Sequence, residues 1–322
     1  MKKVLLTGAA GFIGSHTAEA YLEKGYAVVG VDNFSSGKRE NLCDVENNEN
    51  FTFCEGDIRD RDFVNALYAQ HKPHIINHQA AQKSVPASVD NPHHDAEENV
   101  LALLNLLMAH KTHAFEQFIF ASSGGALAPI PQGNKIPTED DKPQLLSPYA
   151  VTKFAGENYI ALYAALFNFS YTALRYANVY GPRQIPEGEC GVIPIFVENA
   201  MQNKPSVLFA YPDMPEGCTR DYVHVSDVAA ANILSAEKPA NTVIHISSAI
   251  ELPIAKIYAE LMLAMGKDLP LHREGPRAGD IRRSVVDNAR ARELLGWVPK
   301  IGLKEGLKDL VLTVSYTAPS AK

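Results

Sequence analysis

Three glycines near the N-terminus constrain the fold of this chain more than any other feature. Gly8, Gly11 and Gly14 recur at intervals of three residues directly after the apolar run Val4-Leu5-Leu6. Such a turn lets a pyrophosphate approach the N-terminus of the next helix, where free N–H groups and the helix dipole favour an anion. The spacing predicts a dinucleotide-binding turn, and a tight turn without any ligand is the alternative reading.

A carboxylate follows this turn at the distance that a dinucleotide site requires. The second apolar run, Ala27 to Val31, ends in Asp32, about twenty residues after the glycines. A carboxylate here can accept hydrogen bonds from the adenosine ribose hydroxyls and would repel a 2′-phosphate. We therefore expect NAD as the cofactor, while the nearby Lys38 and Arg39 keep NADP open as an alternative.

The first half of the chain alternates short apolar runs with longer amphipathic segments. Runs that are continuously apolar are typical of parallel strands buried on both faces. The pattern predicts an α/β protein with a doubly wound parallel Rossmann sheet. Further expected strands are Phe51–Cys54, Ile75-Ile76, Phe118–Phe120 and Tyr171–Leu174, and expected helices are Phe63–Tyr68, Val100–Met108 and Tyr149–Phe167.

Beyond Tyr176 the composition changes, because glycine and proline become frequent. A helical pattern returns at Val225–Ala236 and a strand pattern at Val243–Ile246. We therefore expect discontinuous domains. Residues 1–176 and roughly 222–248 would form the NAD-binding Rossmann domain, and residues 177–221 and 249–322 would form a smaller, loop-rich substrate-binding lobe.

Composition excludes several other classes of protein. The net charge of −7 and the pI near 5.9 argue against a nucleic-acid partner, which needs a basic face. No stretch reaches the roughly 18 apolar residues of a membrane span, and glycines interrupt the N-terminal run where a signal peptide would continue. The four cysteines lack metal-ligand spacing, so we expect no metal and free thiols in the cytoplasm.

A tyrosine and a lysine four residues apart form the candidate catalytic pair. Tyr149 and Lys153 follow Ser147-Pro148 within one helical pattern, so their side chains share a helix face. A cation beside a phenol stabilises the phenolate, which a general acid/base needs. The pair alone is common on amphipathic helices. Its occurrence together with the glycine turn, about 140 residues earlier, favours a catalytic role for the pair.

The glycine turn and the Tyr/Lys pair together resemble the extended branch of the short-chain dehydrogenase/reductase family. The resemblance covers about residues 3 to 312 and is strongest toward bacterial UDP-glucose 4-epimerases. It is carried by TGAAGFIGSH (7–16), VDNFSSGKRENL (31–42), SPYAVTKFAGE (147–157), LRYANVYGPRQ (174–184), TRDYVHVSDVA (219–229) and LLGWVPK (294–300).

The resemblance implies a full set of site residues. Ser123, Tyr149 and Lys153 match the catalytic triad. The expected NAD-binding residues are Gly8, Gly11, Phe12, Ile13, Gly14, Asp32, Asn33, Asp57, Ile58, Ala80, Lys83, Asn99, Tyr149, Lys153 and Tyr176. The expected substrate-binding residues are Lys83, Ser123, Tyr149, Asn178, Arg220, Arg277, Asp280 and Ser284. Several have structural alternatives: Asp57 could cap a helix, and Arg220 could pair with Asp221 or Asp227.

The implied reaction is 4-epimerisation of a UDP-hexose through a 4-keto intermediate, with a homodimer formed through residues 100–111 and 149–167. The small Ser284 leaves room for the N-acetylhexosamine pair beside glucose and galactose. Gly124 and Gly125 follow Ser123 where a dehydratase or decarboxylase needs acidic groups. A uronate 4-epimerase, a 4-keto-sugar reductase and a non-catalytic NAD-binding sensor stay open.

Two departures from the family pattern concern the site itself. Leu127-Ala128-Pro129 stands where the serine motif usually continues with tyrosine and glycine, so the loop under the sugar could differ in shape. Gln79 replaces an expected apolar residue. It would place an amide near the phosphates or leave one unsatisfied in the core.

Overall fold

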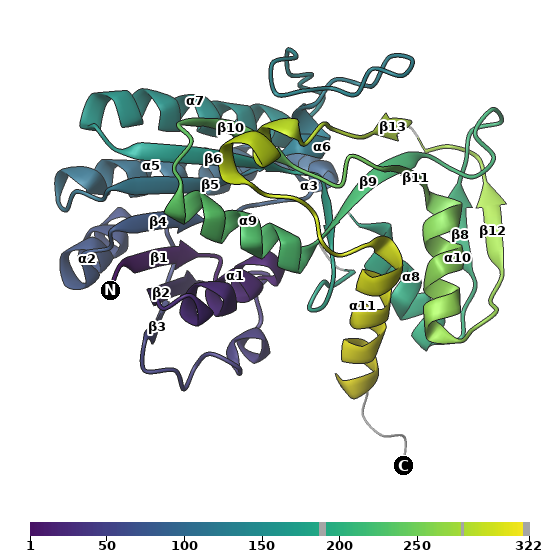
Figure 1. Ribbon diagram of the computed structural model, residues 1–322, viewed down its shortest axis with the longest axis horizontal. Coiled ribbons are helices and arrows are strands. Elements are labelled where there is room, and N and C mark those ends of the chain that lie inside the picture. The colour runs from purple at the N-terminus through teal and green to yellow at the C-terminus, as the bar shows by residue number, and fades with distance from the viewer. Residues whose placement is uncertain (187–190, 278–279, 318–322) are drawn as a thin grey trace.

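A computed structural model describes residues 1–186, 191–277 and 280–317 (Figure 1). Its main sheet has seven strands in the order β3-β2-β1-β4-β5-β6-β10, and every pair of neighbours is parallel. The predicted Rossmann sheet is confirmed. Its strands are β1 (Lys3–Thr7), β2 (Ala27–Asp32), β3 (Phe51–Glu55), β4 (Ile75–His78), β5 (Gln117–Ser123), β6 (Ser170–Tyr176) and β10 (Thr242–Ile246).

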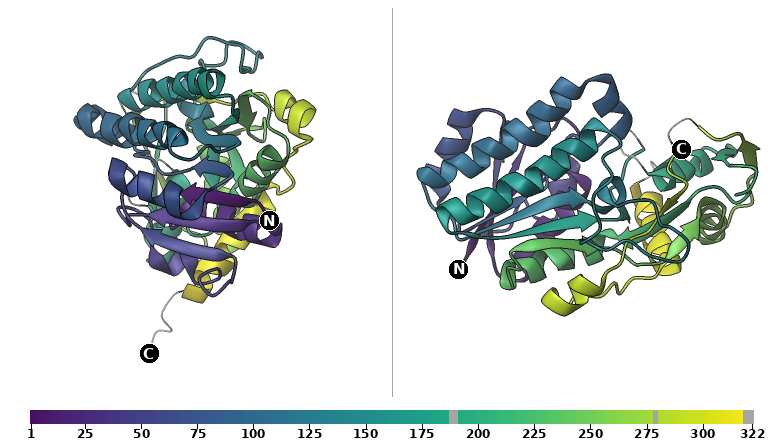
Figure 2. Two further views of the ribbon diagram at one scale, coloured as in Figure 1. Left: turned by 90° about the vertical axis from the view of Figure 1, so that its left-hand side faces the viewer. Right: turned by 90° about the horizontal axis from the view of Figure 1, so that it is seen from above.

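Helices cover both faces of this sheet, as the two views of Figure 2 show. Leu6 points to one face and its neighbour Leu5 to the other, as the two-residue period of a strand requires. The first face packs against α1 (Phe12–Glu23) and α9 (Val225–Glu237). The second packs against α2 (Arg61–His71), α5 (Ala102–Met108) and α7 (Pro148–Phe167).

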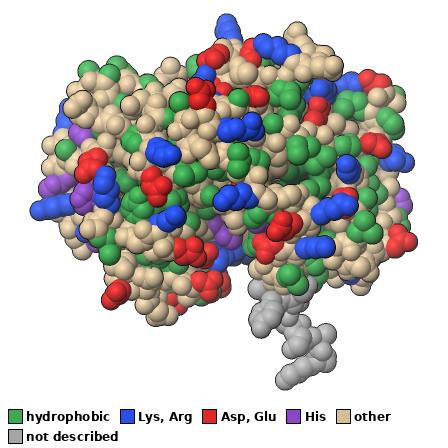
Figure 3. Space-filling model, viewed as in Figure 1, with side chains coloured by type: hydrophobic (Ala, Val, Ile, Leu, Met, Phe, Trp, Pro, Cys, Tyr) green, Lys and Arg blue, Asp and Glu red, His purple; other side chains and the backbone are tan. Residues whose placement is uncertain are grey.

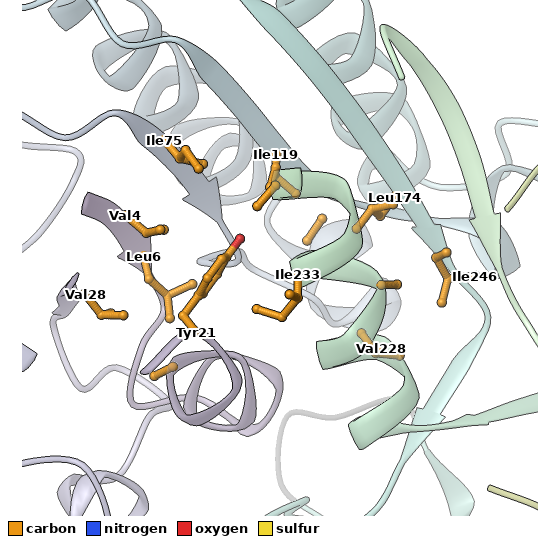
Figure 4. Packing of buried hydrophobic residues seen from close by; sticks show 14 of the residues in the cluster. Val4, Leu6, Tyr21, Val28, Ile75, Ile119, Leu174, Val228, Ile233 and Ile246 are labelled. Carbon is orange, nitrogen blue, oxygen red and sulfur yellow. The ribbon is translucent and has the colours of Figure 1, made fainter. Parts of the chain in front are cut away.

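Figure 4 shows the first of these two cores from close by. Side chains of the strands, among them Val4, Ile75 and Leu174, meet Val228 and Ile233 of α9. α1 and α9 lie side by side although about 200 residues separate them in sequence. The packing explains why the chain returns from the lobe to extend the sheet with β10.

The lobe beside the sheet has its own small sheets and its own core. In it β9 (Thr219–His224) pairs with β7 (Asn178–Tyr180), β11 (Glu251–Pro253) and β13 (Arg283–Ser284), and β8 (Ser206–Phe209) pairs with β12 (Leu271–Glu274). Three helices pack around a cluster that includes Phe196, Leu261 and Leu307. They are α8 (Val192–Met201), α10 (Ile254–Met265) and α11 (Leu303–Thr317).

Short helical segments complete the fold. Near the glycine turn and along the α5 layer lie η1 (Arg39–Leu42), α3 (Val85–Asp90), α4 (Pro92–Ala96), η2 (Glu97–Leu101) and η3 (Ala109–Lys111). α6 (Gly124–Leu127) follows β5, and η4 (Ala291–Leu295) precedes Trp297. Although we expected residues 249–322 in the lobe, Ala291, Leu295 and Trp297 pack in the core of the main sheet. The expected domain boundaries themselves stay a prediction.

Two properties of the surface and the helices concern possible partners. Acidic and basic side chains are interspersed over the face drawn in Figure 3. Within the described ranges, no helix has the length and the apolar character needed to cross a bilayer.

Cys43, Cys54 and Cys218 are free thiols, and Cys190 lies outside the described residues.

Candidate active site

A cavity of about 1270 Å³ runs from the carboxyl ends of the main strands into the lobe. In a doubly wound sheet this edge is where ligands bind, because the loops after the strands diverge at the point where strand order reverses. Here the order reverses at β1, whose neighbours are β2 and β4. The cavity lining includes the glycine turn and Asp32 from the Rossmann side, and Arg220, Arg277 and Ser284 from the lobe.

The glycine turn has the geometry of a site for a phosphate-bearing cofactor. Gly8 adopts a left-handed φ of +68°, and a Cβ on it would lie 2.8 Å from the backbone nitrogen of Ala80. A Cβ on Gly14 would lie 1.9 Å from the carbonyl oxygen of Gly8. Gly11 precedes α1, whose first turn has no side-chain cap, and Phe12 and Ile13 line the cavity there. The helix N-terminus is thus open to an anion.

Asp32 closes the second strand beside this turn. Its carboxylate is nearly buried and accepts hydrogen bonds from the backbone N–H groups of Ala10 (2.9 Å) and Phe34 (2.8 Å). Burial raises the pKa of Asp32, and these two hydrogen bonds act against the rise. The carboxylate lines the cavity, so its remaining acceptor positions suit ribose hydroxyls.

Asp57 and its neighbours form the next part of the wall. Asn33 donates to Asp57 Oδ2 at 3.0 Å, and Arg59 binds the same carboxylate at 2.6 Å. The Arg59 hydrogen bond holds the pKa of Asp57 at about 2. Asp57 also accepts the backbone N–H of Arg59, while Asp60 caps α2. The suggested helix-capping role for Asp57 is therefore wrong, whereas Asn33, Asp57 and Ile58 all line the cavity.

The three candidate catalytic residues come from β5 and α7. Ser123 ends β5, and its hydroxyl accepts the N–H of Ala126 at 3.2 Å, which caps α6. α7 begins at Pro148 with Ser147 as its cap, so Tyr149 sits in the first turn. Ser123 and Tyr149 line the cavity, and Lys153 Nζ lies 5.9 Å from the centre of the Tyr149 ring.

Lys153 is held in a buried position behind the tyrosine. Its ammonium donates to the carbonyl of Ala121 at 2.9 Å and lies 5.0 Å from the Phe120 ring centre. Burial lowers the pKa of Lys153 to about 8, and the charges of Asp95 and Glu157 act against the fall. A cation of lowered pKa next to a phenol is a typical setting for proton transfer.

Asn99 stands behind the cavity wall rather than in its lining. It belongs to η2, a π-helical turn of a kind frequent at functional sites, and its amide donates to Gln82 O at 2.9 Å. Asp95 and Thr152 join the same buried cluster, with Thr152 Oγ1 donating to Asp95 Oδ2 at 2.8 Å. Sequence reasoning missed Asp95, although its i,i+4 spacing from Asn99 was a usable signal. The cofactor role of Asn99 stays a prediction.

Ala80 and Lys83 belong to the segment that follows β4. The N–H of Ala80 donates to Thr7 Oγ1 at 3.2 Å, and both residues lie in the cavity wall beside the glycine turn. Lys83 also lines the cavity, and its charge acts to lower the pKa of Asp32. From this position the Lys83 ammonium can bind a phosphate group of the cofactor or of the substrate.

At the lobe end, Asn178 and Arg220 lie on neighbouring strands. Asn178 donates to the carbonyl of Asp221 at 3.0 Å, and Arg220 donates to the carbonyls of Thr219 (2.8 Å) and Ile281 (2.6 Å). Asp221 and Asp227 are occupied elsewhere, by Ser248 and by the N–H of Lys300. The suggested structural ion pair of Arg220 is therefore wrong, and Arg220 lines the cavity.

Arg277 and Asp280 flank the two residues 278–279, which lie outside the described chain. Arg277 is 60% exposed, its Nε lies 3.4 Å from Asp280 Oδ2, and its guanidinium lies 4.5 Å from the Phe209 ring centre. Phe209 was not singled out from the sequence, because nothing marks one aromatic residue of β8 as lining a cavity. The stacked guanidinium can meet a diphosphate or a base.

Ser284 lies opposite the start of the serine-motif helix. It pairs with Arg220 across β13 and β9, and a Cβ built on Gly125 would come 3.7 Å from its hydroxyl oxygen. Both residues line the cavity. The unusual loop after Leu127 is attached to this strand, because Arg283 donates to the carbonyl of Gly133 at 2.9 Å.

Gln79 is neither unsatisfied nor isolated. Its amide donates to Asn77 Oδ1 at 2.6 Å and to Asn232 Oδ1 at 3.0 Å. Tyr176 also lines the cavity and donates its hydroxyl to Gln79 Oε1 at 3.3 Å. The expectation of an unsatisfied amide in the core is wrong, because Asn77 and Asn232 supply partners that the sequence did not reveal.

Comparisons with known proteins agree with this geometry. Residues 4–247 match the NAD dependent epimerase/dehydratase family. A UDP-glucose 4-epimerase of Mycolicibacterium smegmatis is 40% identical, over 96% of this chain and 97% of its own. A crystal structure of UDP-glucose 4-epimerase from Thermotoga maritima with UDP-glucose has a TM-score of 0.92 and 39% identity, over 98% and 100% of the chains. A Thermus thermophilus UDP-glucose 4-epimerase in complex with NAD has a TM-score of 0.90 and 37% identity, over the same shares.

The chain belongs to the NAD-dependent epimerase/dehydratase family. It is an NAD-dependent enzyme that epimerises a UDP-linked sugar at C4, which confirms the expected fold, cofactor and enzyme class. The turn formed by Gly8 and Gly14 fits NAD, because an added Cβ at either glycine would fill it. The carboxylate of Asp32 in the cavity wall also fits NAD, because it would repel the 2′-phosphate of NADP.

Proposed function

We propose that the enzyme interconverts UDP-glucose and UDP-galactose, and that it also accepts UDP-N-acetylglucosamine and UDP-N-acetylgalactosamine. The observation that carries the second part is the facing pair Gly125 and Ser284, which line the cavity with no side chain on one side and a small one on the other. An acetamido group is larger than a hydroxyl. A narrow wall at this point would exclude it, and this pair leaves it space.

In the proposed reaction Tyr149 takes the proton of the sugar 4-hydroxyl and later returns it. The Lys153 ammonium, 5.9 Å from the Tyr149 ring centre, favours the phenolate by its charge. Ser123, at the end of β5, supplies a hydroxyl that can bind the sugar 4-oxygen. NAD accepts and returns the hydride of C4 when it is bound.

Inversion at C4 requires the sugar to turn while the nucleotide stays fixed. We assign the fixed grip to Arg220, Arg277 and Asn178, which lie at the lobe end of the cavity. Arginine suits a diphosphate because its fork of N–H donors makes charge-assisted hydrogen bonds. Arg220 is itself oriented by two main-chain carbonyls, so its direction does not depend on the substrate.

The test is a comparison of two substrate pairs on the wild-type enzyme and Ser284→Tyr. Purified protein is incubated with each of the four UDP-sugars, and the 4-epimer formed is measured by NMR. We expect the wild type to epimerise both pairs, and Ser284→Tyr to lose the acetylated pair while keeping most of its activity on glucose and galactose. Ser284→Ala, which keeps the space, is the matched control and should behave like the wild type.

Each contrary result has a distinct meaning. A wild type that is inactive on the acetylated pair, or a tyrosine variant that handles it unchanged, contradicts the specificity. Turnover of UDP-glucuronate alone would favour the uronate epimerase. NAD binding without turnover of any UDP-sugar would indicate the sensor.

We also propose that the enzyme works as a homodimer in the cytoplasm. The helical layer that carries the catalytic pair exposes apolar side chains, with Leu162 53% and Leu166 63% exposed on α7 and Leu101 54% exposed on η2. Exposed apolar side chains on these helices suit contact with a second copy of the chain. Sedimentation equilibrium of wild type and Leu166→Glu tests this, and a monomeric wild type contradicts it.

A further inference from the structure

The strongest unexplained feature is a buried polar cluster under the cavity floor. It joins Tyr21 of α1, Asn77 of β4, Gln79, Tyr176 of β6 and Asn232 of α9. Tyr21, Asn77 and Asn232 are completely buried, whereas Gln79 and Tyr176 reach the cavity. In Figure 4 the hydroxyl of Tyr21 points away from α1 toward the strands. Buried polar groups have a cost unless all are paired, so such a cluster needs an explanation.

The direction of each amide in the cluster follows from one fixed point, the main-chain carbonyl of Val228. That oxygen can only accept, so the group of Asn232 that lies 2.9 Å from it must be the NH₂. The same NH₂ donates to the Tyr176 hydroxyl at 2.9 Å. Asn232 Oδ1 therefore points the other way and accepts from Asn77 at 2.9 Å.

The orientation of Gln79 follows in turn. Asn77 uses its NH₂ toward Asn232, so its Oδ1 faces Gln79, and Gln79 must present its own NH₂ to Asn77 and Asn232. A flipped Gln79 would set its oxygen against two other oxygens. Gln79 Oε1 is left to accept the Tyr176 hydroxyl at 3.3 Å. Every polar atom has a suitable partner in one arrangement only, which fixes both side chains at the cavity.

Gln79 and Tyr176 lie between the glycine turn and Ser123. Gln79 precedes Ala80, against which Gly8 packs with no room for a side chain, and it follows β4 at the strand-order reversal. Tyr176 is the direct partner of Ser123 in the β5–β6 pairing. Burial raises the pKa of Tyr176 to about 12, so its hydroxyl keeps its proton and stays a donor.

We propose that Gln79 is a positioning residue for NAD: it holds the Tyr176 phenol in place as a rigid part of the cavity wall between the glycine turn and Ser123. With the wall fixed before the cofactor arrives, NAD binding does not have to order it. An apolar residue at position 79 would remove the Gln79 contacts of the Tyr176 hydroxyl, leaving it only the bond from Asn232. It would also leave Asn77 Oδ1 without its donor.

A double-mutant cycle on NAD affinity tests the proposal without any substrate. Calorimetric titration of cofactor-free protein gives the Kd for NAD of the wild type, Gln79→Met, Tyr176→Phe and the double variant. We expect each single change to weaken binding about tenfold, the scale of one lost hydrogen bond with unpaired partners. The double variant should be no weaker than the worse single variant, because both act through the same bond.

Gln70→Met is the control, since Gln70 is exposed on α2 and away from the cavity, and it should bind NAD like the wild type. Fully additive losses in the double variant, or an unchanged Kd in Gln79→Met, overturn the proposal. If Gln79→Met does not fold, Tyr176→Phe decides alone, because it removes one oxygen, and wild-type NAD affinity in that variant also overturns it. The outcome is independent of which sugar the enzyme uses.

Discussion

The two ends of the cavity differ in what forms their walls. At the NAD end the close contacts come from main chain and glycine, with Gly14 so tightly packed that an added Cβ would lie 1.9 Å from Gly8 O. At the lobe end, where we propose that the sugar nucleotide binds, they come from long side chains, of which Arg277 is 60% exposed and stacked on Phe209. A ligand that stays bound through every turnover suits a rigid cradle. A substrate that must enter and leave suits exposed side chains.

The largest effect should come from the residue between the two ends. Tyr149→Phe removes only the hydroxyl that we propose carries the proton, and we expect kcat to fall about 10³-fold. NAD affinity should be unchanged, because the ring stays in the first turn of α7. The kcat comes from a coupled assay of 4-epimer formation and the affinity from calorimetry. A variant that keeps near wild-type kcat would show that another group transfers the proton.

The rigidity of the cradle is tested by Gly14→Ala. The added methyl group forces the backbone apart at the turn, and overpacking of this kind costs about 1–3 kcal/mol, so NAD should bind about 10- to 100-fold more weakly. Gly302→Ala is the matched control, since a Cβ there meets nothing within 4 Å. Equal NAD affinity in the two variants, measured by titration, would remove the contrast between the ends.

The pH dependence of turnover tests Lys153. Its pKa is lowered to about 8, and lysine carries its charge below its pKa, so the cation that favours the Tyr149 phenolate is present at pH 7 and lost as pH rises through about 8. We expect kcat to fall on the alkaline side, about tenfold by one pH unit above that value. A profile flat to pH 10, in protein shown to remain folded by circular dichroism, would contradict this role.

The smallest effect is expected at the lobe end of the cavity. Arg277→Gln removes one exposed charge that we propose binds the diphosphate, and we expect KM for the UDP-sugar to rise about fivefold with little change in kcat. Arg61→Gln, on the exposed start of α2, is the control and should leave both constants unchanged. A drop in NAD affinity in Arg277→Gln would mean that the two ends are not separate.

Local patterns predicted the NAD half of the molecule well. The apolar runs form the strands, and the glycine turn and Asp32 line the same cavity. These features were predictable because each one depends on neighbours close in sequence. The lobe was less predictable: no helix was predicted where α8, α10 and α11 lie. Their packing depends on contacts between distant segments, as Leu261 and Leu307 show.

The same limit applies to the site. Gln79 looked anomalous because its partner Asn232 lies 153 residues away on α9, and no local pattern connects them. Arg220 could not be separated from a surface ion pair until its two carbonyl partners were known. The Tyr149 and Lys153 pair was visible in the sequence because a single helix turn sets its spacing.

The path of the chain between its two parts has a consequence for recombination. It passes from the main sheet to the lobe after β6, returns at α9, leaves again after β10, and comes back once more at η4 before α11. A single crossover after β6 would therefore exchange α9, β10 and η4, which pack in the core of the main sheet, together with the lobe. The proposed role of Ser284 offers a change of sugar preference by one substitution, which leaves this shared core intact.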